Sequence, residues 1–289
     1  MRIAICPNPQ KQPALERAAE AIRILHQHGA ETVMSNELRG CVSAEHICWR
    51  PADSLFAGCD FAVAIGGDGT IIRCAGLILE QAAAAGTEAV RLVGINTGTL
   101  GFLAAFEADE LQMLSRLFTG DYAISRRMLL RTTVQGITKH ALNDIYASRL
   151  NGRICDFSVA VDGRTIGVYR ADGIIFSTPT GSTAYALSAG GPVMEPDLSL
   201  IEMNLICPHS LFARPMLFAP QREIRVTYCG VGDGGLNVHA DGVHTAVLHN
   251  HMSFTVTVSE RVMPFVDCKG YAFYDALNGK LMQPLKGIE

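Results

Sequence analysis

The stretch AIGGDGTIIR, residues 64–73, places a carboxylate inside a glycine turn. A strand-like apolar run, 61–65, precedes the turn, and a helix-like stretch, 70–85, follows it. Such turns commonly hold phosphate, because backbone N–H groups and the positive end of the helix dipole point at the anion. Asp68 would repel that anion, so its presence favours a base that takes a proton from a hydroxyl, or a metal ligand. The alternative is that Asp68 only shapes the turn, since Asp-Gly is a frequent turn pair.

Glycines around Asp68 and a second glycine-rich turn offer the backbone of an anion site. Gly69 and its neighbours allow a ligand to approach the backbone closely, and the hydroxyl of Thr70 is placed to cap the helix. The second turn, GINTGTLGFLA at 94–104, follows another strand-like run and carries Asn96, Thr97 and Thr99, although alone it is also typical of an ordinary loop. Two such turns at neighbouring strand ends favour a shared anion site. The candidate phosphate contacts are Gly66, Gly67, Thr70, Asn96 and Thr97.

The densest signal is TPTGSTAYALSAGG, residues 178–191, in which eleven of fourteen residues are Thr, Ser, Gly or Ala. A nucleotide pressed against the backbone explains this density of small residues. Tyr185 is placed to cover a base or ribose, and Ser188 adds a polar contact. Arg170 and Asp172 flank the apolar strand that precedes the stretch. The alternative is a tight crossing between β-strands that pack on small residues.

Two further stretches carry polar groups. ALNDIYASR, 141–149, supplies Asn143 and Asp144, an amide and a carboxylate suited to an adenine edge and a ribose hydroxyl, with an Asn-Asp turn as the alternative. VHADGVHTAVLHNH, 238–251, gathers four histidines whose spacings match no compact ligand set. It therefore predicts a hairpin with exposed histidines rather than a metal held by protein side chains, and Asp241 in its turn is free to approach a substrate.

The composition is that of a globular protein without a basic footprint. Of the 289 residues, 48% are hydrophobic and 18% charged, and the net charge of -4 argues against general nucleic-acid binding. No run approaches the roughly 20 apolar residues that span a bilayer, and the opening residues do not predict a signal peptide. Nine scattered cysteines without a C-x-x-C pair predict buried free thiols rather than a zinc site or a nucleophile. Together these features predict a cytoplasmic protein.

Strand-like and helix-like segments alternate through the first part of the chain, which predicts a parallel sheet with helices on its faces. In such sheets ligands bind at the carboxyl ends of the strands, where both glycine turns fall. Beyond residue 120 the chain changes to short β-like runs separated by turns such as Asp162-Gly163. The expected fold is α/β plus all-β: a doubly wound α/β domain over 1–120 and an antiparallel β-sandwich-like domain over 121–265.

Taken together, these motifs resemble those of the NAD kinase family, whose members phosphorylate the 2′-hydroxyl of the adenosine ribose of NAD to give NADP. The resemblance rests on motif order and spacing from about residue 60 to 245. The long Thr/Ser/Gly stretch is its most specific part, whereas GGDG turns also occur in lipid kinases and phosphofructokinases. The matching segments are GGDGT (66–70), NTGTLGFLA (96–104), ND (143–144), DGIIFSTPTGSTAY (172–185), LSAGGP (187–192), CPHSLFARP (207–215) and ADG (240–242).

The resemblance implies roles for matching positions. Asp68 would be the general base for the ribose hydroxyl, within a 66–70 turn near the transferred phosphate. The implied NAD-binding residues are Gly69, Phe102, Asn143, Asp144, Thr183, Ala184, Tyr185 and Ser188. Arg170 and Asp172 sit where the family brings a neighbouring subunit close to the nicotinamide end, which implies a homodimer or homotetramer. Aspartate at 144 replaces the family's more frequent glutamate, which shortens the reach of that carboxylate.

The resemblance also implies Mg²⁺ or another divalent cation carried by the nucleotide, and a final segment, about 266–289, that returns to the first domain. The sequence leaves the phosphoryl donor open between ATP, another nucleotide and polyphosphate, since no lysine stands in a P-loop arrangement. The alternatives are a lipid or sugar kinase with a GGDG turn, and a non-catalytic NAD(P)-binding regulator. We expect no nucleic-acid or membrane partner.

Overall fold

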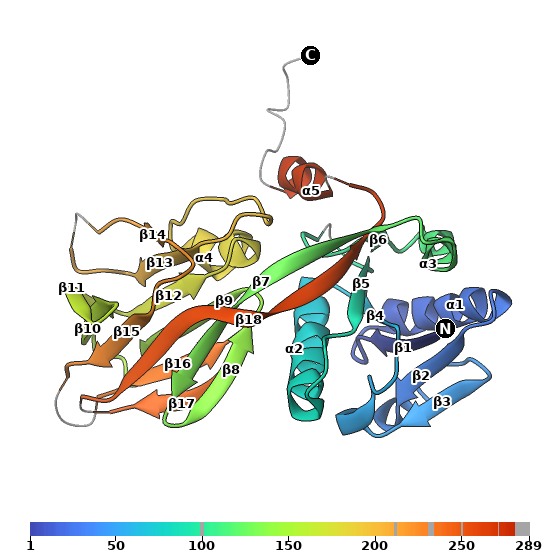
Figure 1. Cartoon of the computed structure of the whole chain (residues 1–289), viewed down its shortest axis with the longest axis horizontal. Helices are drawn as coiled ribbons and strands as arrows, with labels where there is room; N and C mark the ends of the chain where they lie inside the picture. Colours follow the sequence, from blue (N-terminus) through green and yellow to red (C-terminus); the bar gives the residue numbers. More distant parts are fainter. Residues whose placement is uncertain (99–100, 211–212, 231–233, 250, 271, 281–289) are drawn as a thin grey trace, which may run out of the picture. The chain divides into compact units, whose positions relative to one another are not determined.

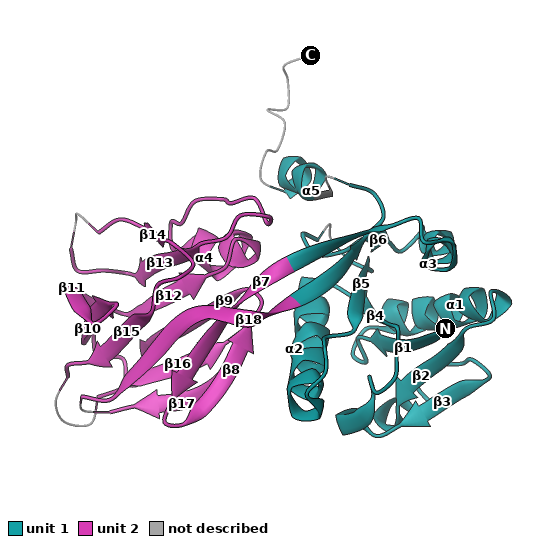
Figure 2. Ribbon diagram, in the orientation of Figure 1, with its two compact units in different colours: residues 1–126, 263–289 teal, residues 127–262 magenta. Residues whose placement is uncertain are grey.

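The computed structural model describes the chain except for residues 99–100, 211–212, 231–233, 250, 271 and 281–289 (Figure 1). The chain forms two compact units, residues 1–126 with 263–289 and residues 127–262 (Figure 2). Strands β7 (Ala123–Val134) and β18 (Ser253–Asp267) contain the two points at which the chain passes from one unit to the other. None of the described helices is long and apolar enough to cross a membrane.

Unit 1 (residues 1–126 and 263–289) is built on a parallel sheet with the order β5-β4-β1-β2-β3. The short strand β6 also runs parallel to β5, and Phe265 of β18 pairs with Leu92. These strands are β1 (Arg2–Pro7), β2 (Glu31–Ser35), β3 (Ile47–Arg50), β4 (Phe61–Gly66), β5 (Arg91–Asn96) and β6 (Phe106–Glu107).

Helices cover both faces of this sheet. Helix α1 (Gln12–Gln27) buries Ile22 and Leu25 in one cluster with strand residues such as Ile5 and Val63. Helix α2 (Asp68–Ala85) lies on the opposite face, where strand side chains are small: a Cβ on Gly94 would lie 2.7 Å from Ile71 Cδ1. The expected doubly wound α/β arrangement is confirmed. The short helices are η1 (Asn36–Leu38), η2 (Ala52–Ser54), η3 (Leu111–Ser115), α3 (Arg116–Thr119) and α5 (Ala272–Lys280).

Unit 2 (residues 127–262) contains two antiparallel sheets. One has the order β14-β13-β12-β9-β16-β17; in the other, β11, β10, β15 and β18 are neighbours in that order, and β7 pairs with β18 and β8. The strands are β8 (Ile137–Ala141), β9 (Asp144–Arg149), β10 (Cys155–Val161), β11 (Arg164–Ala171), β12 (Gly173–Ser177), β13 (Ile201–Ile206), β14 (Met216–Phe218), β15 (Ile224–Tyr228), β16 (Leu236–Ala240) and β17 (Val243–Leu248).

The two sheets enclose one apolar core, in which Phe176 of the first meets Phe254 of the second edge-to-face at 6.3 Å between ring centroids. The expected antiparallel β-sandwich is confirmed. Because side chains alternate along a strand, the residues between the core positions of β9, β12 and β13 project from the other face of the first sheet. That outer face carries Asp144, Tyr146, Ser177, Glu202 and Asn204.

The cysteine expectation is partly wrong. All nine cysteines are free, and Cys74 and Cys155 are buried, but Cys41 and Cys207 are exposed. Exposure follows position: the exposed pair lies in segments between strands, whereas the buried pair lies on α2 and β10.

We expect Gly94→Ala to lower the free energy of unfolding by about 1–3 kcal/mol, the usual cost of overpacking. The added Cβ would lie 2.7 Å from Ile71 Cδ1 and 2.9 Å from the carbonyl oxygen of Leu103, so the helix and the second glycine turn must shift. Urea denaturation measures the change. Gly76→Ala within α2 is the matched control: nothing lies within 4 Å of its added Cβ, and helix propensity raises stability by up to about 1 kcal/mol. Equal effects of the two substitutions would contradict the packing described here.

Candidate functional site

Asp68 is the first residue of α2, immediately after the extended N-cap residue Gly67 (φ -93°, ψ -178°). The prediction that the helix begins at Thr70 and that the Thr70 hydroxyl caps it is therefore wrong. Gly67 makes the bend from β4 in one residue, so Thr70 already lies in the first helical turn. Its buried hydroxyl instead accepts a hydrogen bond from Asn8 Nδ2 at 3.2 Å.

The Asp68 carboxylate is bound to the second glycine turn. Its oxygens accept hydrogen bonds from the backbone N–H of Phe102 at 3.0 Å and of Leu103 at 3.3 Å. A Cβ on Gly101 would lie 2.4 Å from Asp68 Oδ1, so only glycine lets the backbone pass this close. Asp68 thus does have a structural role, but it anchors a distant loop rather than shaping its own turn.

The two glycine turns lie side by side at the carboxyl ends of β4 and β5. The backbone N–H of Thr97 donates to the carbonyl oxygen of Gly66 at 3.1 Å. The Asn96 side chain braces its own loop: Nδ2 donates to Glu107 at 2.8 Å and Oδ1 accepts from the Gly98 N–H at 3.1 Å. The Thr97 hydroxyl is buried and has no hydrogen-bond partner within the described chain, which leaves it available to a ligand. Thr99 lies outside the described residues.

A cation from the end of the chain completes this cluster in unit 1. Lys280, the last residue of α5, places Nζ 3.5 Å from Asp68 Oδ2 and 4.6 Å from the centre of the Phe102 ring. Phe273, also on α5, lies 6.2 Å from the Phe102 ring. Sequence reasoning missed Lys280, because the contact spans 212 residues of chain and no local motif marks it.

In unit 2 a second carboxylate organises the loop that carries Asn143 and Asp144. Asp241 accepts hydrogen bonds from the backbone N–H groups of Leu142 at 2.6 Å, Asn143 at 2.8 Å and Asp144 at 3.2 Å. Both Asp241 oxygens bind its own chain, so Asp241 holds this loop, and its approach to a substrate stays a prediction. Desolvation nevertheless raises the pKa of Asp241 to about 6, against the three N–H donors that lower it.

Asn143 and Asp144 hold polar groups that the protein leaves unpaired. Asn143 Oδ1 is buried without a hydrogen-bond partner in the described chain. The Asp144 side chain is buried, and burial together with the Asp241 charge raises its pKa to about 7. A bound ligand that carries hydroxyl groups could donate hydrogen bonds to this amide oxygen and to the carboxyl, which have no donors among the described residues.

The Thr/Ser/Gly stretch folds into the short helices η4 (Thr180–Thr183) and α4 (Tyr185–Ser188), separated by Ala184. Part of its small-residue content is packing. Thr178 Oγ1 donates to the carbonyl oxygen of Leu142 at 2.6 Å. A Cβ added to Gly181 would lie 2.1 Å from the carbonyl oxygen of Asn143. The stretch therefore buttresses the 142–144 loop. Thr180 Oγ1 is buried without a partner within the described residues, whereas Tyr185 and Ser188 are exposed and Thr183 is half-buried.

An aromatic cluster lies beside this loop on the outer sheet face. Tyr146 meets Tyr185 edge-to-face at 5.3 Å and stacks on His239 at 4.6 Å, with 10° between the ring planes. The expectation of exposed hairpin histidines is thus wrong for His239, which pairs with Tyr146 across β9 and β16. Sequence reasoning missed Tyr146, although its spacing of two from Asp144 places both on one face of β9.

Arg170 lies near the end of β11 (Arg164–Ala171), and Asp172 follows β11 directly before β12. Asp172 is therefore about 20 Å from Thr178, since six residue steps of extended chain separate them. Each is in an ion pair: Arg170 forms two hydrogen bonds with Asp156 at 2.7 and 2.8 Å, and Asp172 accepts from Arg149 at 2.7 Å. The chain therefore holds these two side chains apart from Asn143 rather than beside it.

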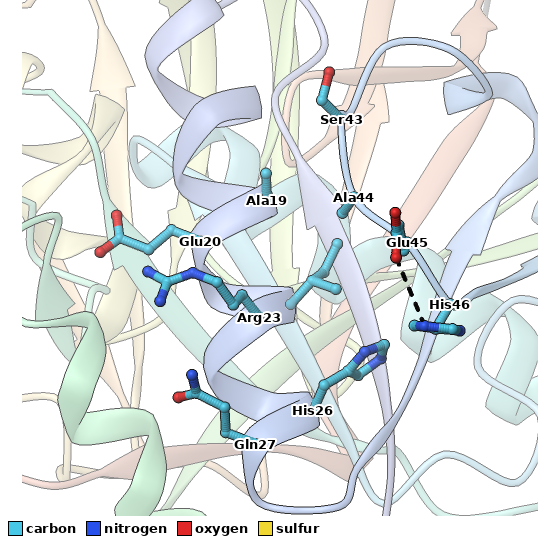
Figure 3. Close-up of a pocket in the computed structure, with 10 residues that line it drawn as sticks. Ala19, Glu20, Arg23, His26, Gln27, Ser43, Ala44, Glu45 and His46 are labelled. Carbon is cyan, nitrogen blue, oxygen red and sulfur yellow. Dashed lines mark ion pairs between the residues drawn. The ribbon is translucent and has the colours of Figure 1, made fainter.

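Among the described residues no group of three His, Cys, Asp or Glu side chains could hold a metal ion. A cavity of about 790 Å³ lies elsewhere on unit 1, between α1 and the 43–46 segment (Figure 3). His26, His46, Glu45 and Arg23 line it, and none of the predicted site residues does. It is a feature separate from the glycine turns.

We expect Asp144→Asn to stabilise the protein at pH 8 and to be nearly neutral at pH 4. Burial raises the pKa of Asp144 from 3.8 to about 7, so the folded chain keeps a proton that the unfolded chain releases. The stabilisation from this bound proton is complete below about pH 4 and is lost as pH rises through 7. At pH 8 the wild type has therefore lost roughly 1–4 kcal/mol of its free energy of unfolding, a loss that the neutral amide of the variant does not undergo. Urea denaturation at both pH values measures the difference.

Asp162→Asn is the control for this experiment. Asp162 is exposed, and its hydrogen bonds from the Glu223 N–H and Arg222 lower its pKa. Its replacement should therefore give no gain at pH 8. A gain in both variants, or in neither, would contradict the assigned environment of Asp144.

Two models of the ATP-NAD kinase family match the chain in order. The N-terminal domain model covers residues 3–122 and the C-terminal domain model covers residues 142–268. Among curated proteins, the NAD kinase of Caldanaerobacter subterraneus subsp. tengcongensis is 32% identical over 98% of this chain and 99% of its own length. The NAD kinase of Chlorobium phaeobacteroides is also 32% identical, over 98% of this chain and 97% of its own length.

Solved structures of two kinases superpose on this chain. A crystal structure of yeast NADH kinase complexed with NADH superposes with a TM-score of 0.88, at 24% identity over 100% of this chain and 89% of that one, and shares its fold. An NAD kinase from Archaeoglobus fulgidus in complex with ATP superposes with a TM-score of 0.73, at 26% identity over 96% of this chain and 98% of that one. With both domain models matched and relatives 32% identical over nearly their whole length, the chain belongs to the NAD kinase family.

Proposed function

We propose that this chain transfers a phosphoryl group from ATP to the 2′-hydroxyl of the adenosine ribose of NAD, giving NADP, with Asp68 as the general base. The family membership supports the reaction, and the solved A. fulgidus relative in complex with ATP supports the donor. The observation that carries the role of Asp68 is its position: the carboxylate stands at the start of α2 and is held by the N–H groups of Phe102 and Leu103.

The chemistry fits a carboxylate fixed in this way. A ribose hydroxyl within about 2.6–3.2 Å of the Asp68 oxygens can give up its proton as its oxygen attacks phosphorus. Backbone N–H groups of the two glycine turns and the start of α2 provide partial positive charge for the phosphoryl oxygens. Asp68 then faces the hydroxyl, and the backbone faces the anion. We assign Gly66, Gly67, Thr70, Asn96 and Thr97 to this phosphate region, Thr97 through its hydroxyl, which has no partner among the described residues.

Adenosine recognition is assigned to unit 2. Asn143 and Asp144 offer an unpaired amide oxygen and a buried carboxyl to the base and ribose. Tyr185, braced by Tyr146, gives an exposed ring face for stacking. Thr183, Ala184 and Ser188 lie beside Tyr185 in the chain and complete the proposed pocket. Gly69 and Phe102 are proposed to contact NAD from unit 1.

The divalent cation, Mg²⁺ or another, is proposed to arrive with ATP, where it would supply positive charge to the phosphates. Its charge would offset the repulsion between Asp68 and the phosphates when bound. Polyphosphate is the competing donor.

We propose a homodimer or homotetramer in which Arg170 and Asp172 serve the site of a neighbouring subunit. β11 is the outermost strand of its sheet, its side chains Val168 and Arg170 share one face, and Ile166 lies at a bulge beside them. Ile166 and Val168 are 40% and 68% exposed. Exposed apolar residues on an edge strand support a contact between subunits here.

We expect Asp68→Asn to lower kcat by about 10²–10⁴ while NAD binding is largely retained, because the amide cannot accept the proton. A coupled assay of NADP formation from NAD, ATP and Mg²⁺ measures kcat, and calorimetry measures NAD binding. Asp109→Asn, at an exposed position of unit 1, is the control and should match the wild type. Wild-type binding of NAD without turnover would favour the regulator; full activity of Asp68→Asn would remove its assignment as the base.

We expect Tyr185→Ala to raise the Kd for NAD roughly 5–150-fold, since stacking of a base on an aromatic ring contributes about 1–3 kcal/mol. Tyr185→Phe keeps the ring and should bind within a factor of a few of the wild type. Calorimetric titration with NAD distinguishes the two variants. Wild-type affinity in Tyr185→Ala would show that this ring does not contact the nucleotide.

A further inference from the structure

We propose that Lys280 is a catalytic residue that supplies the cation for the transferred phosphoryl group. This inference rests on the proposed function. The sequence contains no lysine in a P-loop arrangement, yet phosphoryl transfer depends on positive charge that neutralises the equatorial oxygens of the transferred group. The geometry of unit 1 provides such a charge from a different element, the C-terminal helix α5.

The Lys280 ammonium has two partners at the proposed base, Asp68 and the Phe102 ring. Its Nζ lies 3.5 Å from Asp68 Oδ2 and 4.6 Å from the centre of the Phe102 ring, and α5 is packed there through Phe273, 6.2 Å from Phe102. About 29% of the Lys280 side chain and 28% of that of Asp68 is exposed. The ammonium therefore lies beside Asp68 and is still open to an incoming anion.

The distances at Asp68 bring the Lys280 ammonium close to the transferred phosphoryl group. The attacking oxygen lies within about 3.2 Å of the Asp68 carboxylate when it gives up its proton. The phosphorus lies about 3–3.5 Å from that oxygen before attack. The oxygens of the phosphoryl group therefore come within reach of a flexible lysine whose Nζ already lies beside Oδ2.

The step balances without a further reactant. The ribose O2′ forms a bond to the γ-phosphorus of ATP and its proton passes to Asp68. The bond from that phosphorus to the bridging oxygen breaks, and its electron pair leaves with ADP. Lys280 stays protonated throughout, and its ammonium moves from the Asp68 carboxylate to the phosphoryl oxygens as Asp68 takes the proton and loses its charge.

A packing role for Lys280 makes a different prediction from a charge role. Lys280→Met keeps an unbranched side chain of similar length over the Phe102 ring but removes the charge. Lys280→Arg keeps the charge. Lys269 is the matched control: it lies on the same C-terminal segment and pairs with Glu110, away from Asp68.

The test compares NADP formation by the wild type, Lys280→Met, Lys280→Arg and Lys269→Met, with NAD binding followed by calorimetry. We expect Lys280→Met to lose about 10²–10³ in kcat, as when one stabilising group is removed from a charged transition state. Its Kd for NAD and its thermal unfolding temperature should remain those of the wild type. Lys280→Arg should recover most of kcat, and Lys269→Met should be unaffected.

Each contrary outcome identifies what has failed. A wild type that forms no NADP overturns the proposed function itself. If the wild type is active, a kcat of Lys280→Met equal to or above that of the wild type overturns the assignment of Lys280, and an increase would mean that the ammonium restrains Asp68. Equal loss in Lys280→Met and Lys280→Arg would overturn it as well, since charge would then not be the property that matters.

Discussion

The organisation of unit 1 depends on one carboxylate. Asp68 begins α2 and binds the backbone of Phe102 and Leu103, so a side chain on one strand-to-helix connection fixes the loop after the next strand. Glycine stands at positions 101 and 94 because an added Cβ there would collide with Asp68 and Ile71, respectively. One of the Asp68 oxygens, Oδ2, also contacts Lys280. A group proposed to take a proton is thereby aligned by the backbone that it also supports.

Unit 2 uses a carboxylate in a related way. Asp241 accepts hydrogen bonds from three successive N–H groups of residues 142–144 and so positions Asn143 and Asp144. Gly181 and Thr178 press on the same loop from the other side. Desolvation raises the pKa of Asp241 to about 6, and desolvation together with the Asp241 charge raises the pKa of Asp144 to about 7. Loop placement thus costs electrostatic energy that the hydrogen bonds offset.

The fold class followed from the sequence, because apolar alternation and turn residues record which faces are buried. Strand–turn–helix order also predicted that both glycine turns lie at neighbouring strand ends. The start of α2 was missed because an extended Gly67 shortens the turn in a way that residue types do not reveal. Tyr146, His239 and Lys280 were missed for another reason. Their partners are set by strand register or by a contact across 212 residues, and neither is encoded locally.

The order of the chain bears on how this protein is made. Unit 2 is continuous, from 127 to 262, whereas unit 1 is assembled from two segments that flank it. During synthesis the N-terminal segment emerges with Asp68 and both glycine turns, but it lacks Phe265 beside β5 and Lys280 beside Asp68. Domains tend to fold as they leave the ribosome. Asp68, the proposed base, is therefore joined by Lys280 only when nearly the whole chain has been translated. A truncated product would carry the proposed binding loops without this ion pair.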